Sequence, residues 1–594
     1  MKRSSYCGCV KETNIGEEIT VCGWVHSHRN HGGVIFIDLR DREGILQIIF
    51  QPEKKNIFKS AENLHNEYVI SVKGLVKKRP KGTLNSNIAT GNVELVATEL
   101  EILNTSSHLP FEISNYTDTC EELRLKYRYL DLRRPQFQKN FITRHKISQE
   151  IRKFFNENGF LEIETPFLTN STPEGARDFL IPSRLNHGSF FALPQSPQLF
   201  KQILMVSGFD KYYQFAKCFR DEDLRADRQL EFTQIDIEMS FVNEDDIMNI
   251  TEKMLVKVFK KILNIDINTP FERISYTNAI LNYGSDKPDT RFEMKIKDFS
   301  KELKNSKFTI FSSIINRGGV VRGLCIPKCA VYSHTEINEL TKFACKYGAN
   351  GLAWMKITNT GAKSNIVKYF KEEELKKIIH KFNAKSGDLI IFIADEEKIV
   401  IQCLGALRLK IGKENNLIDK NKFNFLWVVD FPLMEWNEEE NKWQSLHHPF
   451  TAPKNEDFIT KENIKTAKAR AYDIILNGTE LGGGSIRIHK NIIQKKIFDI
   501  LNVSEKYSIK KFEFLLNALT YGAPPHGGLA LGFDRLCTLI LKENSIREVI
   551  AFPKTQKTID PLSNAPTSVS DKQIKELGIY ISNLKSNDGL KKIT

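Results

Sequence analysis

A loop rich in arginine and carboxylate side chains has the residue types best suited to catalysis. It lies between residues 212–219 and 231–241, whose alternation of apolar and polar residues predicts two antiparallel strands. The loop carries Arg220, Asp221, Glu222, Asp223, Arg225, Asp227 and Arg228. Forked guanidinium groups among carboxylates suit the binding of a polyanion together with its metal ion and its base. An ordinary solvated loop is the alternative, and this stretch alone does not decide between the two.

Length, charge and cysteine content limit the number of domains, the class of partner and the cellular compartment that we expect. A chain of 594 residues is too long for one hydrophobic core, so we expect about three or four domains. The net charge of +13 favours a polyanionic partner, although a generally lysine-rich composition would produce the same charge. The ten cysteines lack paired zinc-binding spacing and are expected to be reduced thiols. Without a signal core or an apolar run of roughly 18 residues, a soluble cytoplasmic protein is expected.

Residues 1–108 follow the period of β-strands. Five short alternating runs, with glycine-bearing turns and a helical stretch near 57–65, predict a small closed barrel of the OB type. Such barrels bind single-stranded nucleic acid by stacking bases on aromatic rings beside a cationic groove. Phe36 and Arg29 are candidates for this role, with the alternative that Phe36 belongs to the core. The expected basic rim consists of Lys77, Lys78, Arg79 and Lys81.

Five further segments are expected after the barrel. One of them has its own alternation of strand-like and helical runs, which predicts a self-contained α/β insertion. In chain order the segments are a polar hinge over 109–136, the first part of a core over 137–284, the insertion over 285–415, the second part of the core over 416–560, and a C-terminal extension over 561–594.

The core is expected to begin with a long helix from Phe137 to Asn158, which Gly159 ends. The strand that follows contains Pro166. Because proline cannot donate to a ladder, this strand is expected at the edge of a sheet or at an interface. Another helix is expected near residues 467–476.

Three constellations occur in a fixed order along the core. They are the strand with Pro166, the segment Phe219–Glu222 in the charged loop, and Gly532–Arg535, where a glycine-rich strand runs into an apolar helix. A small residue lets a nucleotide approach the backbone, and an arginine at a turn binds phosphate. In this order the three motifs resemble those of the class II aminoacyl-tRNA synthetases.

The resemblance covers nearly the whole chain. The stretches TPEGARDF, LPQSPQLFKQ, FRDEDLRADRQ, EFTQIDIE, HHPFT, GGGSIRIH and PPHGGLALGFDR look like the bacterial type of aspartyl-tRNA synthetase, in class IIb. The resemblance implies an α+β multidomain protein. Its parts would be an N-terminal OB-fold β-barrel for anticodon binding, a class II catalytic core built on an antiparallel sheet, and an inserted α/β domain similar to the GAD domain of that type.

The resemblance also implies the reaction. L-aspartate attacks the α-phosphate of ATP, pyrophosphate leaves, and the aspartyl group then passes to the 3′ end of tRNA. Because two anions meet, positive charge and in-line positioning supply most of the catalysis. By resemblance, Arg220 binds the α-phosphate, Arg535 the γ-phosphate and Glu222 the adenine amino group. The other residues implied at ATP are Asp221, Gln229, Glu480, Gly532, Phe533 and Asp534.

Two carboxylates look like the family's ligands for Mg²⁺, the expected cofactor. Asp473 and Glu480 are seven residues apart, about two turns if the expected helix continued, although Gly478 interrupts it. Glu480 is implied in catalysis together with Arg220 and Arg535. Without the resemblance, an exposed helix end would be the preferred interpretation of this pair.

Recognition of aspartate requires a cation directed at its side-chain carboxylate. Lys201 and Arg487 match the family's two such groups, and the doubled charge argues against an asparagine site. Asp236 shares a strand face with Glu238 and is the candidate for binding the substrate ammonium group. The other residues implied at aspartate are Glu174, Gln198, Arg220 and His447, with His448 as a weaker candidate.

Two barrel positions bear on which tRNA is charged. His31 and Gly82 resemble the form with relaxed specificity, which accepts both tRNA-Asp and tRNA-Asn and implies a partner amidotransferase for the misacylated product. The alternatives are an enzyme strict for tRNA-Asp, an asparaginyl or lysyl synthetase, and a non-catalytic RNA-binding paralogue. We also expect a homodimer, because an edge strand with Pro166 needs cover.

Overall fold

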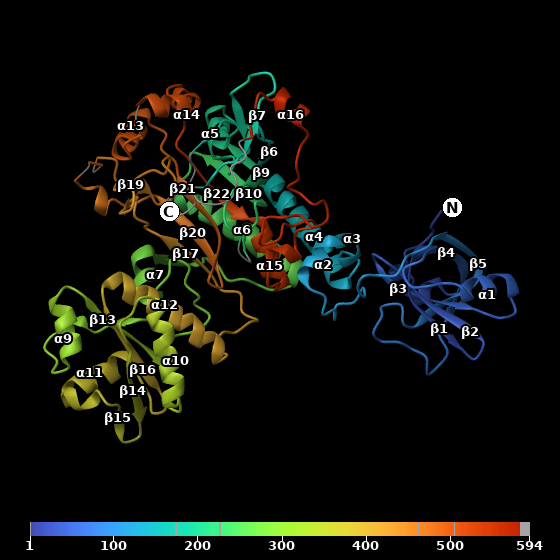
Figure 1. Cartoon of the computed structure of the whole chain (residues 1–594), viewed down its shortest axis with the longest axis horizontal. Helices are drawn as coiled ribbons and strands as arrows, with labels where there is room; N and C mark the ends of the chain where they lie inside the picture. Colours follow the sequence, from blue (N-terminus) through green and yellow to red (C-terminus); the bar gives the residue numbers. More distant parts are fainter. Residues whose placement is uncertain are drawn as a thin grey trace. The chain divides into compact units, whose positions relative to one another are not determined.

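The computed structural model describes residues 2–172, 176–224, 227–457, 459–460, 462–503 and 505–581. The chain divides into two compact units, one built mainly from Met1–Ile142 and the other mainly from Thr143–Ile550. Figure 1 shows the elements of both units with their labels. No described helix has both the length and the apolar composition to cross a membrane.

The first unit contains a closed five-stranded barrel with the strand order β1-β2-β3-β5-β4, which confirms the predicted OB-type fold. Alternate residues of each strand, such as Ile35, Ile37 and Leu39, point into a dry core. The elements are η1 (Cys7–Cys9), η2 (Glu12–Asn14), β1 (Glu18–His31), β2 (Val34–Asp41), β3 (Gly44–Phe50), α1 (Lys55–Glu62), β4 (Val69–Lys78) and β5 (Val93–Asn104).

The barrel surface agrees with one sequence prediction and corrects another. Phe36 lies half-buried on the outer face of β2, not in the core, so its ring can be reached by a base. Lys77, Lys78 and Lys81 are exposed, as expected for a rim. Arg79 is not, because its side chain is 5% exposed and donates to the carbonyl oxygen of Val93 at 3.0 Å. The prediction of Arg79 as a rim cation is therefore wrong.

A short helical segment follows the barrel within the first unit and comprises α2 (Glu121–Lys126) and α3 (Arg128–Asp131). Asp131 is fully buried and accepts hydrogen bonds from Arg128 at 2.6 Å and from Arg134 at 2.8 Å. Because a buried carboxylate is tolerated only when it is paired, these two arginines fix the turn that leads into α4 (Pro135–Glu157).

The second unit is organised around an eight-stranded, mostly antiparallel sheet with the order β11-β17-β20-β21-β22-β10-β9-β6. Its strands are β6 (Leu161–Glu162), β9 (Lys211–Phe219), β10 (Glu231–Ser240), β11 (Glu272–Ser275), β17 (Phe425–Val429), β20 (Ala471–Leu476), β21 (Thr479–Ile486) and β22 (His526–Gly532). The predicted edge strand is confirmed as β6 at the end of the sheet, but it is shorter than expected and stops before Pro166.

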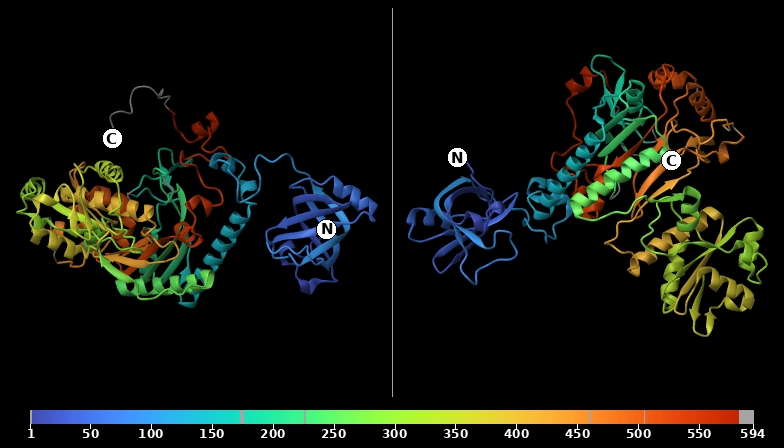
Figure 2. Two further views of the ribbon diagram at one scale, coloured as in Figure 1. Left: turned by 90° about the horizontal axis from the view of Figure 1, so that it is seen from below. Right: turned by 180° about the vertical axis from the view of Figure 1, so that it is seen from behind.

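One face of this sheet is covered by helices. Apolar side chains of α4, α6 (Glu244–Leu263) and α15 (Phe533–Leu541) pack against strand residues such as Ile235, Trp427 and Leu529. Figure 2 shows the long helices α4 and α6 running along the sheet. The alternate residues of the same strands therefore face the other side, where the charged side chains of β10 gather.

The helix expected near residues 467–476 does not form, because this segment contains β20. Tyr472 and Ile474 pack into the core that contains α4 and α6, whereas Ala471 and Ile475 pack into a second apolar cluster. Burial on both faces produces a continuous apolar run, which has the same composition as a buried helix. Asp473 and Glu480 consequently lie on two neighbouring strands of a hairpin and not along one helix.

The other core elements surround the sheet. They are β7 (Leu180–Pro182), β8 (Phe190–Ala192), α5 (Gln198–Val206), α7 (Tyr276–Tyr283), β18 (Met434–Asn437), β19 (Lys442–Ser445), η4 (Ile464–Thr466), α13 (Asn491–Ile500), α14 (Glu505–Ala518), η5 (Ile546–Glu548) and α16 (Asp571–Glu576).

The segment between α7 and β17 forms a second sheet with the order β12-β13-β16-β14-β15 and helices on both faces. In Figure 1, α10 and α12 lie on one side of it and α9 and α11 on the other. Its elements are β12 (Lys297–Asp298), α8 (Ser300–Leu303), α9 (Thr309–Asn316), β13 (Val320–Ile326), α10 (His334–Cys345), β14 (Ala353–Thr358), β15 (Gly361–Lys363), η3 (Val367–Tyr369), α11 (Glu372–Phe382), β16 (Leu389–Asp395) and α12 (Glu397–Glu414).

Candidate active site

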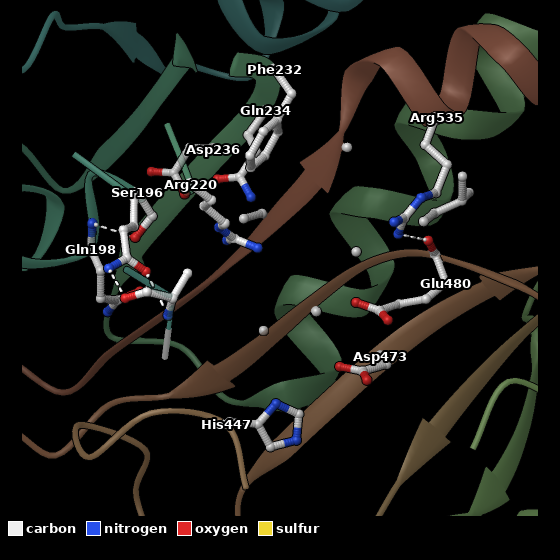
Figure 3. A pocket seen from close by; sticks show the side chains of 18 of the residues that line it. Ser196, Gln198, Arg220, Phe232, Gln234, Asp236, His447, Asp473, Glu480 and Arg535 are labelled. Atoms are coloured by element: carbon white, nitrogen blue, oxygen red, sulfur yellow. Dashed lines mark hydrogen bonds between the residues drawn. The ribbon is translucent and has the colours of Figure 1, made fainter. Parts of the chain in front are cut away.

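A cavity of about 530 Å³ opens on the sheet face opposite to α4 and α6. Its walls come from α5, from β10, from the β20–β21 hairpin, from the junction of β22 with α15, and from loop residues within 220–222, 227–229 and 446–450. Figure 3 shows Phe232, Gln234 and Asp236 pointing from one strand into the space that Asp473 and Glu480 face from the other side. Segments far apart in the sequence thus contribute to one site.

Four buried charges form a network at one end of the cavity. The Nζ atom of Lys201 lies 2.6 Å from Oδ1 of Asp236 and 3.3 Å from Oε2 of Glu238. Arg487 donates to Glu238 through Nε at 2.9 Å and through a terminal nitrogen at 3.1 Å. Each of these side chains is at most 2% exposed. Two cations and two carboxylates are therefore held together in a site closed to bulk water.

The environment shifts the pKa values of the two carboxyl groups in opposite directions. Burial raises the pKa of Asp236, against the opposing charge of Lys201. Burial would also raise the pKa of Glu238, but the charges of Arg487 and Lys201 outweigh it and lower this pKa. Glu238 is therefore an anion that orients two cations, whereas Asp236 lines the cavity and its buried Oδ2 has no hydrogen-bond partner in the described chain.

Glycine residues make room for the buried carboxylates. A Cβ atom at Gly528 of β22 would lie 2.0 Å from Oε2 of Glu238, and one at Gly483 of β21 would lie 2.4 Å from Oδ1 of Asp473. Both distances are far below a van der Waals contact. The glycine-rich sequences of these two strands are thus required for the charged side chains to lie flat against the sheet.

Two histidines border the charged network. Nε2 of His448 lies 2.7 Å from a terminal nitrogen of Arg487, and Ser485 binds the same nitrogen at 2.6 Å. His447 packs edge-on against the ring of Phe431. Burial lowers the pKa of His447 to about 4, against the raising effect of Glu480, and the ring is neutral at pH 7. His448, the weaker sequence candidate, is thus the one in direct contact with the network.

The opposite end of the cavity combines arginines with an aromatic ring. The guanidinium of Arg220 lies over Phe232, 5.0 Å from the ring centroid. Glu222 pairs with Arg228 at 2.6 Å, and Arg535 donates to the carbonyl oxygen of Glu480 at 2.5 Å. A flat aromatic surface between forked cations suits a nucleotide, whose base stacks and whose phosphates are anionic.

Asp473 and Glu480 form an acidic pair beside Arg535. Glu480 is bound by Lys287, with 2.8 Å between Nζ and Oε2, and this ammonium and Arg535 lower its pKa against the effect of burial. Burial and the neighbouring charge of Glu480 raise the pKa of Asp473 well above its usual value. Within the described residues the Asp473 side chain has no hydrogen bond or ion pair, and no cluster of three or more His, Cys, Asp or Glu side chains could hold a metal.

A hard divalent cation fits this pair. Mg²⁺ in proteins is commonly held by one or two carboxylates, with phosphate oxygens and water completing the shell. The unpartnered carboxylate of Asp473 and its repulsion with Glu480 provide such an incomplete oxygen site next to an arginine that can bind phosphate.

Most residues predicted from the sequence line the cavity together: Gln198, Lys201, Arg220, Glu222, Gln229, Asp236, His447, Asp473, Glu480, Arg487, Gly532, Asp534 and Arg535. Asp221 and Phe533 do not line it. Asp221 is exposed and donates its backbone N–H to Arg177, and Phe533 packs in the core against Phe215. Glu174 lies outside the described residues.

Asp534 lines the cavity, but its carboxylate is already engaged. It accepts a hydrogen bond from the backbone of Thr233 at 2.7 Å and pairs with Arg144 at 2.7 Å. Asp534 therefore ties β10 to α15 and acts on the arrangement of the site.

His31 and Gly82 lie on the barrel, in the other unit. His31 is exposed at the end of β1, and Gly82 has a φ of +93° in the loop after β4.

Three contributors were missed by the sequence analysis. Glu238 was identified only by its strand face and given no role, although it binds both cations. Phe232 is one of the alternating residues of β10 and was assigned no role of its own, and Lys287 lies near the start of the expected insertion, outside any motif. The alternation that placed Asp236 on one strand face would also place Phe232 there.

Comparisons with known proteins agree with this geometry. Residues 120–556 match the family model "tRNA synthetases class II (D, K and N)", and residues 19–103 match "OB-fold nucleic acid binding domain". The aspartate–tRNA(Asp/Asn) ligase of Endomicrobium trichonymphae is 73% identical over 98% of this chain and 99% of its own length. The ligase of the same name from Thermodesulfovibrio yellowstonii is 56% identical over 98% of this chain and 100% of its own.

Solved structures support the fold. The asparaginyl-tRNA synthetase from Pyrococcus horikoshii, complexed with asparaginyl-adenylate, matches with a TM-score of 0.58 and 19% identity and covers 93% of this chain and 98% of that chain. From the family match over 120–556 and the full-length relatives, the chain belongs to the class II tRNA synthetases of the D, K and N group, within the family of aspartate–tRNA(Asp/Asn) ligases.

Proposed function

We propose that this chain attaches L-aspartate to tRNA in two steps, first forming aspartyl-adenylate from ATP and then transferring the aspartyl group to the 3′ end of tRNA. The observation that carries the proposal is the combination in one cavity of a buried Lys201–Asp236–Glu238–Arg487 network with an acidic pair beside Arg535. The buried network suits a small dicarboxylic amino acid, and the acidic pair with Arg535 suits a nucleoside triphosphate.

The buried network supports the choice of amino acid. Lys201 and Arg487 bind the side-chain carboxylate of aspartate, while Asp236, with its unpartnered Oδ2, receives the substrate ammonium. Gln198 contributes Nε2, a buried donor without a partner in the described chain. An asparagine side chain would leave one of the two cations without a matching anion, at a cost of several kcal/mol (about 3–5).

ATP binding occupies the other end of the cavity. Arg220 binds the α-phosphate, Arg535 the γ-phosphate, and Glu222 with Gln229 the adenine, whose ring stacks near Phe232. Asp473 and Glu480 would hold Mg²⁺, which neutralises phosphate charge when it is bound. Arg220, which lines the same cavity as the charged network, orients the aspartate carboxylate toward the α-phosphate.

The choice of tRNA depends on the barrel. The relaxed form, which charges both tRNA-Asp and tRNA-Asn, is favoured by His31, Gly82 and the Asp/Asn designation of the similar ligases. Misacylated Asp-tRNA-Asn then requires a partner amidotransferase. Charging of tRNA-Asp and tRNA-Asn transcripts tests this proposal, because aspartylation of tRNA-Asp alone would indicate the strict form.

A cytoplasmic homodimer completes the proposal. The edge strand β6 and the segment after it expose apolar side chains, among them Leu161, Phe167 and Leu168, each at least 50% exposed. A second copy of the same surface would cover them. Sedimentation of a species near 68.3 kDa at low micromolar concentration would contradict the dimer.

The six segments expected from the sequence, with 285–415 as a self-contained GAD-like insertion, are part of the same proposal. The activity itself is tested by ATP–pyrophosphate exchange dependent on L-aspartate. A purified protein that shows no exchange would be a non-catalytic RNA-binding paralogue, and exchange driven by asparagine or lysine would identify a different synthetase.

A further inference from the structure

Lys287 is the cation of the cavity that belongs to no sequence motif. It follows α7 on the linker that leads into β12, and its side chain is 42% exposed toward the cavity. Its Nζ atom lies 2.8 Å from Oε2 of Glu480. A residue from the linker of the second sheet therefore reaches the acidic pair of the active site.

The ammonium group of Lys287 forms the ion pair that partly neutralises Asp473 and Glu480. Among the described residues, Lys287 is the single ion-pair partner of the Glu480 side chain, and the Asp473 side chain has none. Arg535 is close, but it donates to the carbonyl oxygen of Glu480 at 2.5 Å and pairs with Asp227 at 3.5 Å. One lysine thus faces two carboxylates that would otherwise repel each other.

The linker that carries Lys287 is held firmly. Arg408 of α12 is 1% exposed and donates to the carbonyl oxygens of Asp289, Phe292, Glu293 and Met294 at distances between 2.9 and 3.1 Å. On the core side, Asn424 donates to Thr290 at 2.5 Å, and Arg291, which pairs with Asp289 of the same linker at 2.6 Å, donates to the carbonyl oxygen of Asn477 at 3.5 Å. The reach of Lys287 is therefore set by contacts with both the core and the inserted segment.

We propose that Lys287 is a positioning residue for adenylate formation, which neutralises Asp473 and Glu480 before a divalent cation arrives and binds the phosphates of ATP afterwards. A divalent cation held by the two carboxylates would compete with the ammonium for them. The released ammonium would then be available to the phosphate oxygens of ATP in the same cavity. The inference rests on the proposed role of Asp473 and Glu480 as metal ligands.

The first measurement follows metal binding without catalysis. Mn²⁺ is titrated into the protein without ATP and followed by electron paramagnetic resonance, for the wild type and for Lys287→Met, which keeps the side-chain length but removes the charge. Loss of a competing ammonium is expected to tighten Mn²⁺ binding about fivefold. Lys287→Arg should bind Mn²⁺ as the wild type does. Lys304→Met removes an exposed lysine after α8 and serves as the matched control, with no change expected.

The second measurement follows the nucleotide. The KM for ATP in aspartate-dependent pyrophosphate exchange is expected to rise about tenfold in Lys287→Met, whereas the KM for aspartate stays within twofold. Unchanged Mn²⁺ affinity in Lys287→Met, or an unchanged KM for ATP, overturns the inference. Absence of exchange in the wild type would overturn the proposed function instead, and the Mn²⁺ titration would still decide whether Lys287 competes with a metal.

Discussion

The substitution Glu238→Gln probes the charge network with the smallest possible change, because it keeps the size of the side chain and removes one negative charge. Glu238 is fully buried and receives two hydrogen bonds from Arg487 at 2.9 and 3.1 Å, with Lys201 at 3.3 Å. In the variant, two buried cations share the single carboxylate of Asp236. We expect a loss of both stability and aspartate recognition.

The magnitude follows from the burial of these groups. Removing one partner of a buried ion pair typically costs about 3–5 kcal/mol, because the remaining charge is left uncompensated in a medium that solvates it poorly. The charges of Arg487 and Lys201 hold the pKa of Glu238 below its ordinary value. Its ionised form therefore stabilises the fold above the ordinary pKa of glutamate, and this contribution is lost as pH falls through the lowered folded-state pKa.

Native-state hydrogen exchange of the β10 and β21 amides measures this loss directly as a free energy of opening. Glu252→Gln provides a matched control in the same unit. Glu252 is 3% exposed and accepts hydrogen bonds from Trp427 at 2.9 Å and from the backbone of Phe271 at 3.2 Å, and it forms no ion pair with any residue that the structure describes. Glutamine can accept the same bonds, so the control should lose about 1 kcal/mol or less.

Recognition of the substrate should fail in parallel. The KM for aspartate in Glu238→Gln is expected to rise at least tenfold, since misplacement of Lys201 or Arg487 by about 1 Å can cost up to a hundredfold. The KM for ATP should change little. If Glu238→Gln matched Glu252→Gln in stability and the wild type in aspartate KM, the four charges would not act as a unit and the reasoning would be refuted.

Three further outcomes follow from other parts of the structure. Gly483→Ala places a Cβ atom 2.4 Å from Oδ1 of Asp473, so the Mg²⁺ concentration for half-maximal pyrophosphate exchange should rise about tenfold, whereas Gly351→Ala, with open space around it, should have no effect. Burial lowers the pKa of His447 to about 4 in the folded protein, so as pH falls its imidazole is protonated in the unfolded chain before it is protonated in the folded one. The wild type therefore loses stability as pH falls from about 6.5 toward 4. His447→Gln should reduce that loss by roughly 3 kcal/mol in denaturation followed at several pH values, and identical pH profiles would contradict the burial of a neutral ring. His31→Ala should change the ratio of tRNA-Asn to tRNA-Asp charging about fivefold while leaving pyrophosphate exchange unaltered, and an unchanged ratio would remove His31 from tRNA choice.

The barrel and the ordered motifs could be predicted from the sequence because each depends on local periodicity. Alternation placed β1 to β5, and the same alternation placed Asp236 and Glu238 on one face of β10. The failure at 467–476 has the same origin, since a strand buried on both faces loses its alternation and its composition no longer separates it from a helix.

Pairing across the site could not be predicted, because it depends on which strands become neighbours. Glu238 of β10 contacts Lys201 on α5 and Arg487, which follows β21. These contacts depend on the strand order β21-β22-β10-β9, which no local sequence pattern encodes. Phe533 is adjacent to Gly532, which lines the cavity, but its ring packs against Phe215 in the core. The sequence could not show this, because the side chain's direction depends on how α15 packs on the sheet. Arg79 likewise has the composition of a surface residue but folds back onto the barrel wall.

The glycine floor of the cavity has a consequence for inhibition. A compound that fills the space above Gly482, Gly483 and Gly484 would contact backbone rather than replaceable side chains. A substitution at Gly483 adds a Cβ atom 2.4 Å from Oδ1 of Asp473, so a resistant variant at this position would displace the carboxylate proposed to hold the metal ion. A substitution that prevents the compound from binding would therefore also impair the enzyme, so few resistant variants would remain active.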